Sequence, residues 1–161
     1  MLAAALAWPL AARADMNETL DISAHFARGA AVIDDEDTPT TGFGFRTGLS
    51  FGEFRVGNGL SGHAADVSRG HVRWFSYEAF AAWAPNGYWH LRPSVELRAH
   101  VDRLAYGDQV SVLTGIGPRF GVLLPIDEYF FVDVGVSRDL FGPEGFRGTF
   151  GIGLPIPLSH L

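Results

Sequence analysis

Residues 89–102 have the sequence WHLRPSVELRAHVD, in which apolar and polar side chains alternate without interruption. A period of two residues predicts a β-strand with one apolar and one polar face. If the polar face is solvated, the strand belongs to a soluble β-protein. If the polar face is enclosed and the apolar face meets lipid, the strand belongs to a membrane barrel. The fold therefore depends on which face of this strand lies inside.

Similar alternation recurs along the chain and predicts eight strands in up-and-down order. Each strand has about the 9–11 residues that cross a bilayer at a tilt. We expect residues 32–41 and 63–70, which are rich in polar residues, to form long loops at one end of the molecule. Short turns, such as the one at residues 85–87, are expected at the end that holds both termini.

Glycine on the polar faces of the late strands indicates which face is inside. A solvated face gains nothing from glycine, which weakens a strand. A narrow eight-stranded lumen does gain, because its interior is filled by interleaved small and large side chains. The polar faces of residues 109–124 and 146–158 carry this pattern: Ser111, Gly115, Gly117, Arg119 and Gly121, then Arg147, Thr149, Gly151 and Gly153. The sequence thus predicts an all-β fold, a single eight-stranded antiparallel up-and-down transmembrane β-barrel.

Two prolines oppose this prediction. Pro93 and Pro118 fall within predicted strands, where a closed barrel has no free edge to tolerate a missing N–H. We expect a bulge near each of them, or a lumen water, to accommodate the missing N–H.

The first residues resemble an export signal. An apolar run ends in Ala12-Arg13-Ala14, an A-x-A cleavage pattern. We therefore expect a signal peptide over residues 1–14 and a barrel domain over residues 15–161. Together they predict location in the outer membrane of a Gram-negative cell.

Composition excludes several function classes. The 161 residues carry a net charge of −6, which argues against nucleic-acid binding. Cysteine is absent, so disulfides and thiolate metal sites are excluded. The six histidines show no metal-ligand spacing, and we expect no cofactor and no metal. The expected partners are outer-membrane lipids and lipopolysaccharide, bound by a monomer.

Three segments carry a family resemblance: GYWHLRPSVEL at 87–97, TGIGPRFGV at 114–122 and GIGLPI at 151–156. They resemble the small eight-stranded outer-membrane barrels, namely the OmpA-like transmembrane domains and the lipid A 3-O-deacylase (PagL) family. In the deacylases, the resemblance implies a catalytic His-x-Ser-Asn motif on the seventh strand, facing lipid. The corresponding positions here are Ser137, Arg138 and Asp139, with no histidine. A serine nucleophile needs a base within hydrogen-bond reach, so we expect no catalysis.

Two groups of charged residues are candidate sites. Five residues of the predicted inward faces should form one ion-pair network that closes the lumen, because buried charges must be paired: Arg92, Glu96, Arg98, Arg119 and Asp133. A proton or solute path through the same residues is the functional alternative. The second group is a possible cation-binding loop with clustered carboxylates: Asp34, Asp35, Glu36 and Asp37.

The function predicted from these patterns is a structural, adhesive or surface-interaction role in the outer membrane. One alternative is a lipid A-modifying enzyme of the deacylase type, diverged or inactive. Another is a secreted lipocalin-like module that binds an apolar ligand inside the barrel.

Overall fold

The computed structural model describes residues 18–33, 36–67, 70–85, 91–107, 109–142 and 144–160. The predicted signal peptide, residues 1–14, lies outside them. The strands are β1 (Glu18–Ile33), β2 (Glu36–Phe51), β3 (Phe54–Val67), β4 (Gly70–Trp83), β5 (Arg92–Tyr106), β6 (Gln109–Pro125), β7 (Phe131–Arg138) and β8 (Glu144–Pro157), and a short 3-10 helix, η1 (Leu158–His160), follows.

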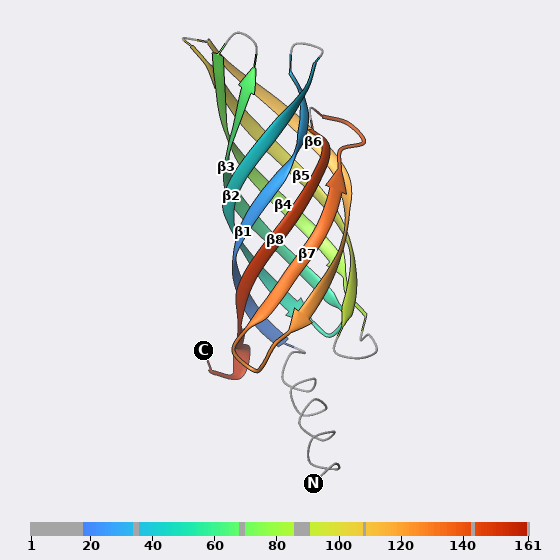
Figure 1. Ribbon diagram of the computed structural model, residues 1–161. Helices are drawn as coiled ribbons and strands as arrows, with labels where there is room; N and C mark the ends of the chain where they lie inside the picture. Colours follow the sequence, from blue (N-terminus) through green and yellow to red (C-terminus); the bar gives the residue numbers. More distant parts are fainter. Residues whose placement is uncertain are drawn as a thin grey trace.

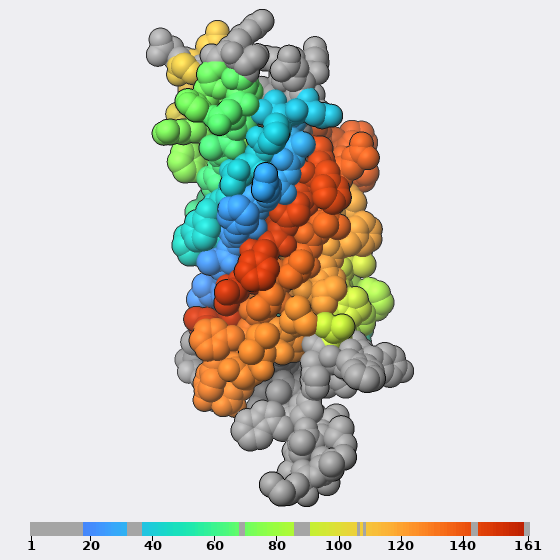
Figure 2. Space-filling model, in the orientation of Figure 1, coloured from blue at the N-terminus to red at the C-terminus, as the bar shows by residue number. Residues whose placement is uncertain are grey.

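Every strand pairs antiparallel with its neighbours in sequence, and β1 pairs with β8 to close the ring (Figure 1). Figure 2 shows this seam, with β1 in blue beside β8 in red. The predicted fold is therefore confirmed. No helix of the described residues is long and apolar enough to cross a membrane.

The register fixes the width of the barrel. Following paired residues from Ala27 through β2, β3 and β4 leads to Leu104 of β5. The path in the other direction, through β8, β7 and β6, leads to Ser94 of the same strand. The two paths thus close with a shift of ten residues, which tilts the strands as Figure 1 shows. A tilted eight-stranded barrel has an interior just wide enough to be filled by side chains.

The two ends of the barrel differ. The terminal end, where β1 begins and β8 ends, also holds the turn at Gly52 and Glu53 and the connection at residues 126–130. The opposite, hairpin end holds the connections between β1 and β2 and between β3 and β4, which are only residues 34–35 and 68–69.

The long loops predicted at residues 32–41 and 63–70 are therefore wrong, because both segments are largely strand. Pro39 illustrates why the sequence misled. It pairs with Ala30 of β1, but β2 meets β3 only from Thr40 onward. On that side its missing N–H faces no partner strand, so the proline is tolerated.

The two mid-strand prolines are accommodated in a similar way. Pro118 adjoins a bulge: the β6–β7 ladder ends at Arg119 and Ser137, and the next bridge, Ile116 to Phe141, is one residue out of register. Pro93 needs no bulge, because β4 pairs with β5 only from Val95 onward. The expected bulge is thus present at Pro118 only.

Burial alternates along the strands with the polar residues inside. Glu96, Arg98 and Asp133 are buried, whereas large apolar side chains face outward, such as Leu97 at 53% exposure and Phe75 at 72%. Interior glycines make room for large neighbours. A Cβ added at Gly151 would overlap the imidazole of His25, and one at Gly115 would overlap that of His100. This inverted distribution is that of a barrel surrounded by lipid.

Candidate functional site

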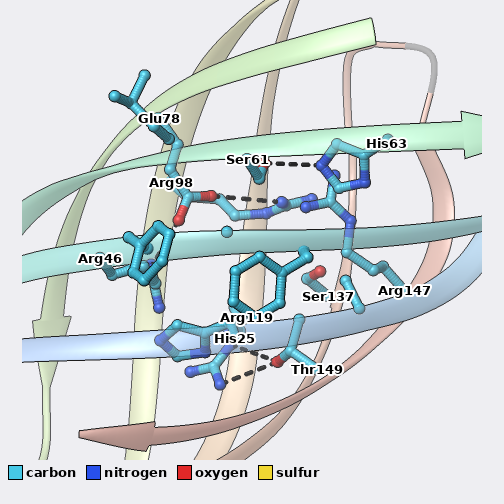
Figure 3. A pocket seen from close by; sticks show the side chains of 15 residues that line it. His25, Arg46, Ser61, His63, Glu78, Arg98, Arg119, Ser137, Arg147 and Thr149 are labelled. Carbon is cyan, nitrogen blue, oxygen red and sulfur yellow. Dashed lines mark hydrogen bonds and ion pairs between the residues drawn. The ribbon is translucent and has the colours of Figure 1, made fainter. Parts of the chain in front are cut away.

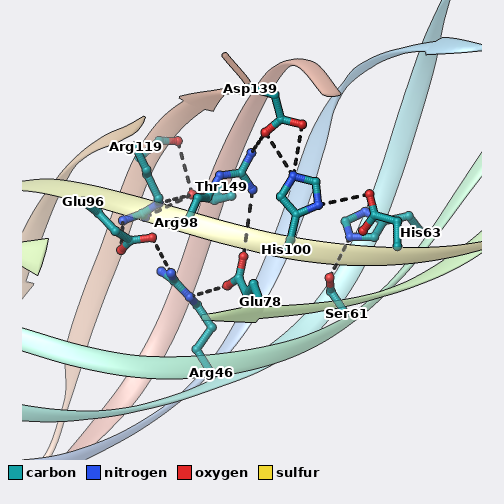
Figure 4. Close-up of polar contacts among 12 residues, drawn as sticks. Arg46, Ser61, His63, Glu78, Glu96, Arg98, His100, Arg119, Asp139 and Thr149 are labelled. Carbon is teal, nitrogen blue, oxygen red and sulfur yellow. Dashed lines mark hydrogen bonds and ion pairs between the residues drawn. The ribbon is translucent and has the colours of Figure 1, made fainter. Parts of the chain in front are cut away.

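The barrel interior holds the chain's densest group of charged side chains among the described residues, and Arg46 of β2 lies near its centre (Figure 4). Its Nε lies 2.6 Å from Oε1 of Glu78, and its Nη2 donates to Glu96. The guanidinium also stacks on Phe80, 4.0 Å from the ring centroid. Arg46 therefore joins β2 to both β4 and β5 across the lumen.

Arg119 of β6 is the second arginine around which interior side chains gather. Its Nη2 donates to Oδ1 of Asp133 at 2.6 Å, and its Nη1 lies 3.7 Å from Oε2 of Glu96. Nη2 also donates to Oγ1 of Thr149 at 3.0 Å. Glu96 thus lies between two arginines from different strands, which supply the partners that a buried carboxylate requires.

Toward the hairpin end, Asp139 extends the network beyond the last residue of β7. Its Oδ1 accepts from Nη2 of Arg98 at 3.1 Å, and its Oδ2 lies 3.0 Å from Nε2 of His100. The other imidazole nitrogen of His100 lies 3.1 Å from Asp102. These contacts anchor the β7–β8 connection inside the barrel.

Toward the terminal end, Asp21 is the acceptor of a smaller cluster. Thr19 and Ser50 donate to it at 2.7 Å and 2.8 Å, and Nε of Arg55 lies 2.8 Å away. The guanidinium of Arg55 lies 5.5 Å from the centroid of Phe80, the ring that also contacts Arg46. Phe80 therefore connects the two clusters.

The interior charges balance in number. Six arginines of the described residues point inward, and so do six carboxylates: Arg46, Arg55, Arg92, Arg98, Arg119 and Arg147, with Asp21, Glu78, Glu96, Asp102, Asp133 and Asp139.

The structure places the five predicted network residues on the inner face. Glu96, Arg119 and Asp133 are in contact. Arg98 is connected to the group through Glu78, 3.9 Å away. Arg92 lies toward the terminal end, where its Nη2 donates to the carbonyls of Gly52 and Ala84.

Sequence reasoning missed three central members: Arg46, Glu78 and Asp139. Arg46 and Glu78 lie on the polar faces of β2 and β4, so alternation alone could have placed them inside. Asp139 lies one residue beyond β7 and continues the inward alternation of Gly135 and Ser137, so the same signal could have placed it inside.

The second half of the acidic stretch is strand rather than loop. Glu36 and Asp37 belong to β2, and the side chain of Asp37 is exposed. Asp34 and Asp35 lie outside the described residues. Within the described part of the chain, no three histidine or carboxylate side chains are placed to hold a metal ion.

The positions that the deacylase resemblance would make catalytic point in different directions. Ser137 is buried in the interior, whereas Arg138 faces outward. Two serine–histidine contacts occur elsewhere, Ser23 with His25 and Ser61 with His63, each at 2.7 Å. These four side chains also point into the barrel rather than toward lipid.

A cavity of about 30 Å3 lies among these groups, lined by His25, Arg46, Ser61, His63 and Arg98, among others (Figure 3). That volume suffices for one or two water molecules. Apolar layers lie beyond it in both directions. Ala31, Ala65, Val72 and Trp74 pack together at the hairpin end, and Ala84, Leu123 and Phe131 at the terminal end.

Comparison with solved structures agrees with this architecture. Neisserial surface protein A superposes with a TM-score of 0.63 at 15% identity, over 88% of this chain and 97% of that one. The attachment invasion locus protein of Yersinia pestis (Ail), crystallised with the heparin analogue sucrose octasulfate, superposes with a TM-score of 0.50 at 15% identity, over 86% and 97%. The chain has the fold of a small eight-stranded outer-membrane barrel. No protein-family model and no curated protein matches the sequence.

Proposed function

We propose that the protein is a closed barrel of the bacterial outer membrane with a structural or surface-interaction role and no catalytic activity. The observation that carries this proposal is the inverted distribution of polarity. Large apolar side chains cover the exterior, while six arginines and six carboxylates are enclosed. Exposed apolar surface of this extent requires an apolar environment, and a closed barrel leaves no unpaired strand edge within it.

The interior supports a lumen that does not conduct. Glu96 holds Arg46 and Arg119 across the centre of the barrel. Apolar layers lie on either side of this network. A solute crossing the barrel would have to break the buried ion pairs and then pass packed apolar side chains. Such a network acts as a plug and stabilises the barrel from within.

The orientation follows from the barrel class. Outer-membrane barrels keep their termini and short turns on the periplasmic side, so the hairpin end faces the cell surface. A surface role agrees with the name of one structural neighbour, an attachment protein that binds a sulfated sugar analogue. Outer-leaflet lipids and lipopolysaccharide are the immediate partners of such a barrel, which we propose to be monomeric.

Reconstitution tests the proposal. The mature chain refolded into lipid vesicles should show heat-modifiable migration on a gel, and planar bilayers containing it should show no stepwise current. Recovery from cells without detergent in the soluble periplasmic fraction would contradict the membrane location. Regular conductance steps would contradict the plug. Mass spectrometry of lipid A with and without expression should give an unchanged acyl count, and a lost acyl chain would establish the deacylase alternative.

A further inference from the structure

One part of the exterior, over β2 to β5, is hollowed into a groove. Across β2, β3, β4 and β5, two paired rows of outward residues lie side by side: Phe43, Gly62, Phe75 and Arg103, and below them Phe45, Leu60, Tyr77 and Val101. These eight residues line a groove of about 1110 Å3, including its open side.

Gly62 makes the groove. Its paired neighbours on the outer face are the exposed rings of Phe43 and Phe75, and the missing side chain leaves a gap between them. Phe43 packs edge-on against Phe45, with ring centroids 5.2 Å apart. The side walls are therefore aromatic, and the groove suits a linear hydrocarbon chain.

Positive charge lies at the hairpin end of the groove. Arg103 is the last residue of the row that begins at Phe43. On β4, Phe75 pairs with Arg103 and Arg73 pairs with Ala105. Arg73 is therefore the diagonal neighbour of Arg103. Such neighbours lie about 7–8 Å apart. Both arginines are exposed.

Neither arginine is neutralised by a carboxylate of the described residues. The nearest outward carboxylate in the register, Asp66, pairs with His71 instead. Two adjacent guanidinium groups without an acid repel each other, and an anion that bridges them removes this repulsion.

The outward arginines lie toward one end of the barrel. The described chain has four of them, Arg28, Arg73, Arg103 and Arg138, and each lies toward the hairpin end of its strand's outward apolar residues. No outward arginine of the described residues lies on the terminal side. We call these four arginines the arginine collar. In the proposed orientation, the arginine collar lies at the head-group level of the outer leaflet.

From this juxtaposition we infer that the groove binds one molecule of a phosphorylated, acylated glycolipid of the outer leaflet, the lipid A part of lipopolysaccharide. An acyl chain lies between Phe43 and Phe75 over Gly62, and a phosphate bridges Arg73 and Arg103. This inference rests on the proposed membrane location and names a site for the proposed lipid partner. Arginine forks match phosphate oxygens, and such charge-assisted bonds are the strong ones.

Two variants test the two parts of the site. Gly62→Val places a side chain in the groove, and its Cβ makes only ordinary van der Waals contact with the Phe75 ring, at 3.7 Å and 3.9 Å. The double variant Arg73→Gln/Arg103→Gln removes the charge. Matched controls are Gly148→Val, an outward glycine on β8 whose added Cβ meets only the Arg28 carbonyl at 3.6 Å, and Arg138→Gln in the arginine collar.

Binding is measured by native mass spectrometry of the protein in detergent, titrated with bisphosphorylated lipid A, dephosphorylated lipid A or phosphatidylglycerol. We expect one bound bisphosphorylated lipid A, with affinity lowered roughly tenfold or more by each test variant and unchanged in the controls. Equal binding of the phosphorylated and dephosphorylated forms, a preference for phosphatidylglycerol, or equal losses in test and control variants would overturn the site. Heat-modifiability of each sample reports the barrel separately, so a failed membrane location is distinguishable from a failed lipid site.

Discussion

The inner and outer faces of the same strand carry different kinds of side chain in this barrel. On β5, Glu96 and Arg98 are buried at 2% exposure, while Leu97 between them is 53% exposed. Inside, each charged side chain must meet a partner of the right sign and length. Outside, a side chain need only be apolar, because lipid adapts to its shape. Substitutions of similar size should therefore have different consequences on the two faces.

The largest effect is expected for Glu96→Ala. This change removes a carboxylate that contacts both Arg46 and Arg119, and breaking a buried pair costs about 3–5 kcal/mol. The free energy of unfolding, measured by urea titration in lipid vesicles, should fall by that amount. Asp66→Ala breaks the exposed Asp66–His71 pair and should change it by no more than about 1 kcal/mol. Equal effects would mean that Glu96 is solvated.

Charge on the outer face should be costly only where lipid surrounds it. Leu97→Arg, near the middle of β5, should lower the free energy of unfolding in vesicles by about 2–4 kcal/mol. Val110→Arg should cost about 0–1 kcal/mol, because Val110 pairs with Ala105, which lies beyond the natural outward Arg103 toward the hairpin end. The same titration checks both variants, and a harmless Leu97→Arg would place water on that face.

Two glycines of β8 offer the most closely matched comparison, because they lie three residues apart on opposite faces. A Cβ at Gly151 would overlap the imidazole of His25, whereas one at Gly148 meets only a carbonyl oxygen at 3.6 Å. Gly151→Val should lower the free energy of unfolding by about 1–3 kcal/mol, as overpacking does. Gly148→Val should change it by less than about 0.5 kcal/mol. The reverse order would mean that the two faces are assigned the wrong way round.

The same contrast explains what the sequence could predict. Alternation and the glycines of β6 and β8 were sufficient for the barrel, because each is a property of a single strand. The partners of Arg46 were not predictable, since Glu78 and Glu96 meet it only after the ring has closed with its particular register. Arg92 was expected in the same network, and the acceptors of its Nη2 are the backbone carbonyls of Gly52 and Ala84.

The strand ends at the hairpin end were also not predictable. Acidic residues and Pro39 resemble a loop, yet residues 36–41 continue β2 as one arm of a hairpin that extends past the last paired residues of the β2–β3 ladder. There the ladder to β1 alone satisfies the backbone. A rule that treats proline as a strand breaker fails where one neighbour is absent.

The central claim is that β5 has a lipid-facing side and an enclosed side, and spin labelling tests it directly. The chain has no cysteine, so single cysteines can be introduced at Val95, Leu97 and Ala99 on one face, and at Ser94 of β5 and Ser76 of β4 on the other. In vesicles, the outward labels should collide frequently with oxygen dissolved in lipid and rarely with a water-soluble nickel complex. The inward labels should be shielded from both. Equal collision rates at adjacent positions, or high nickel accessibility at Leu97, would contradict the account.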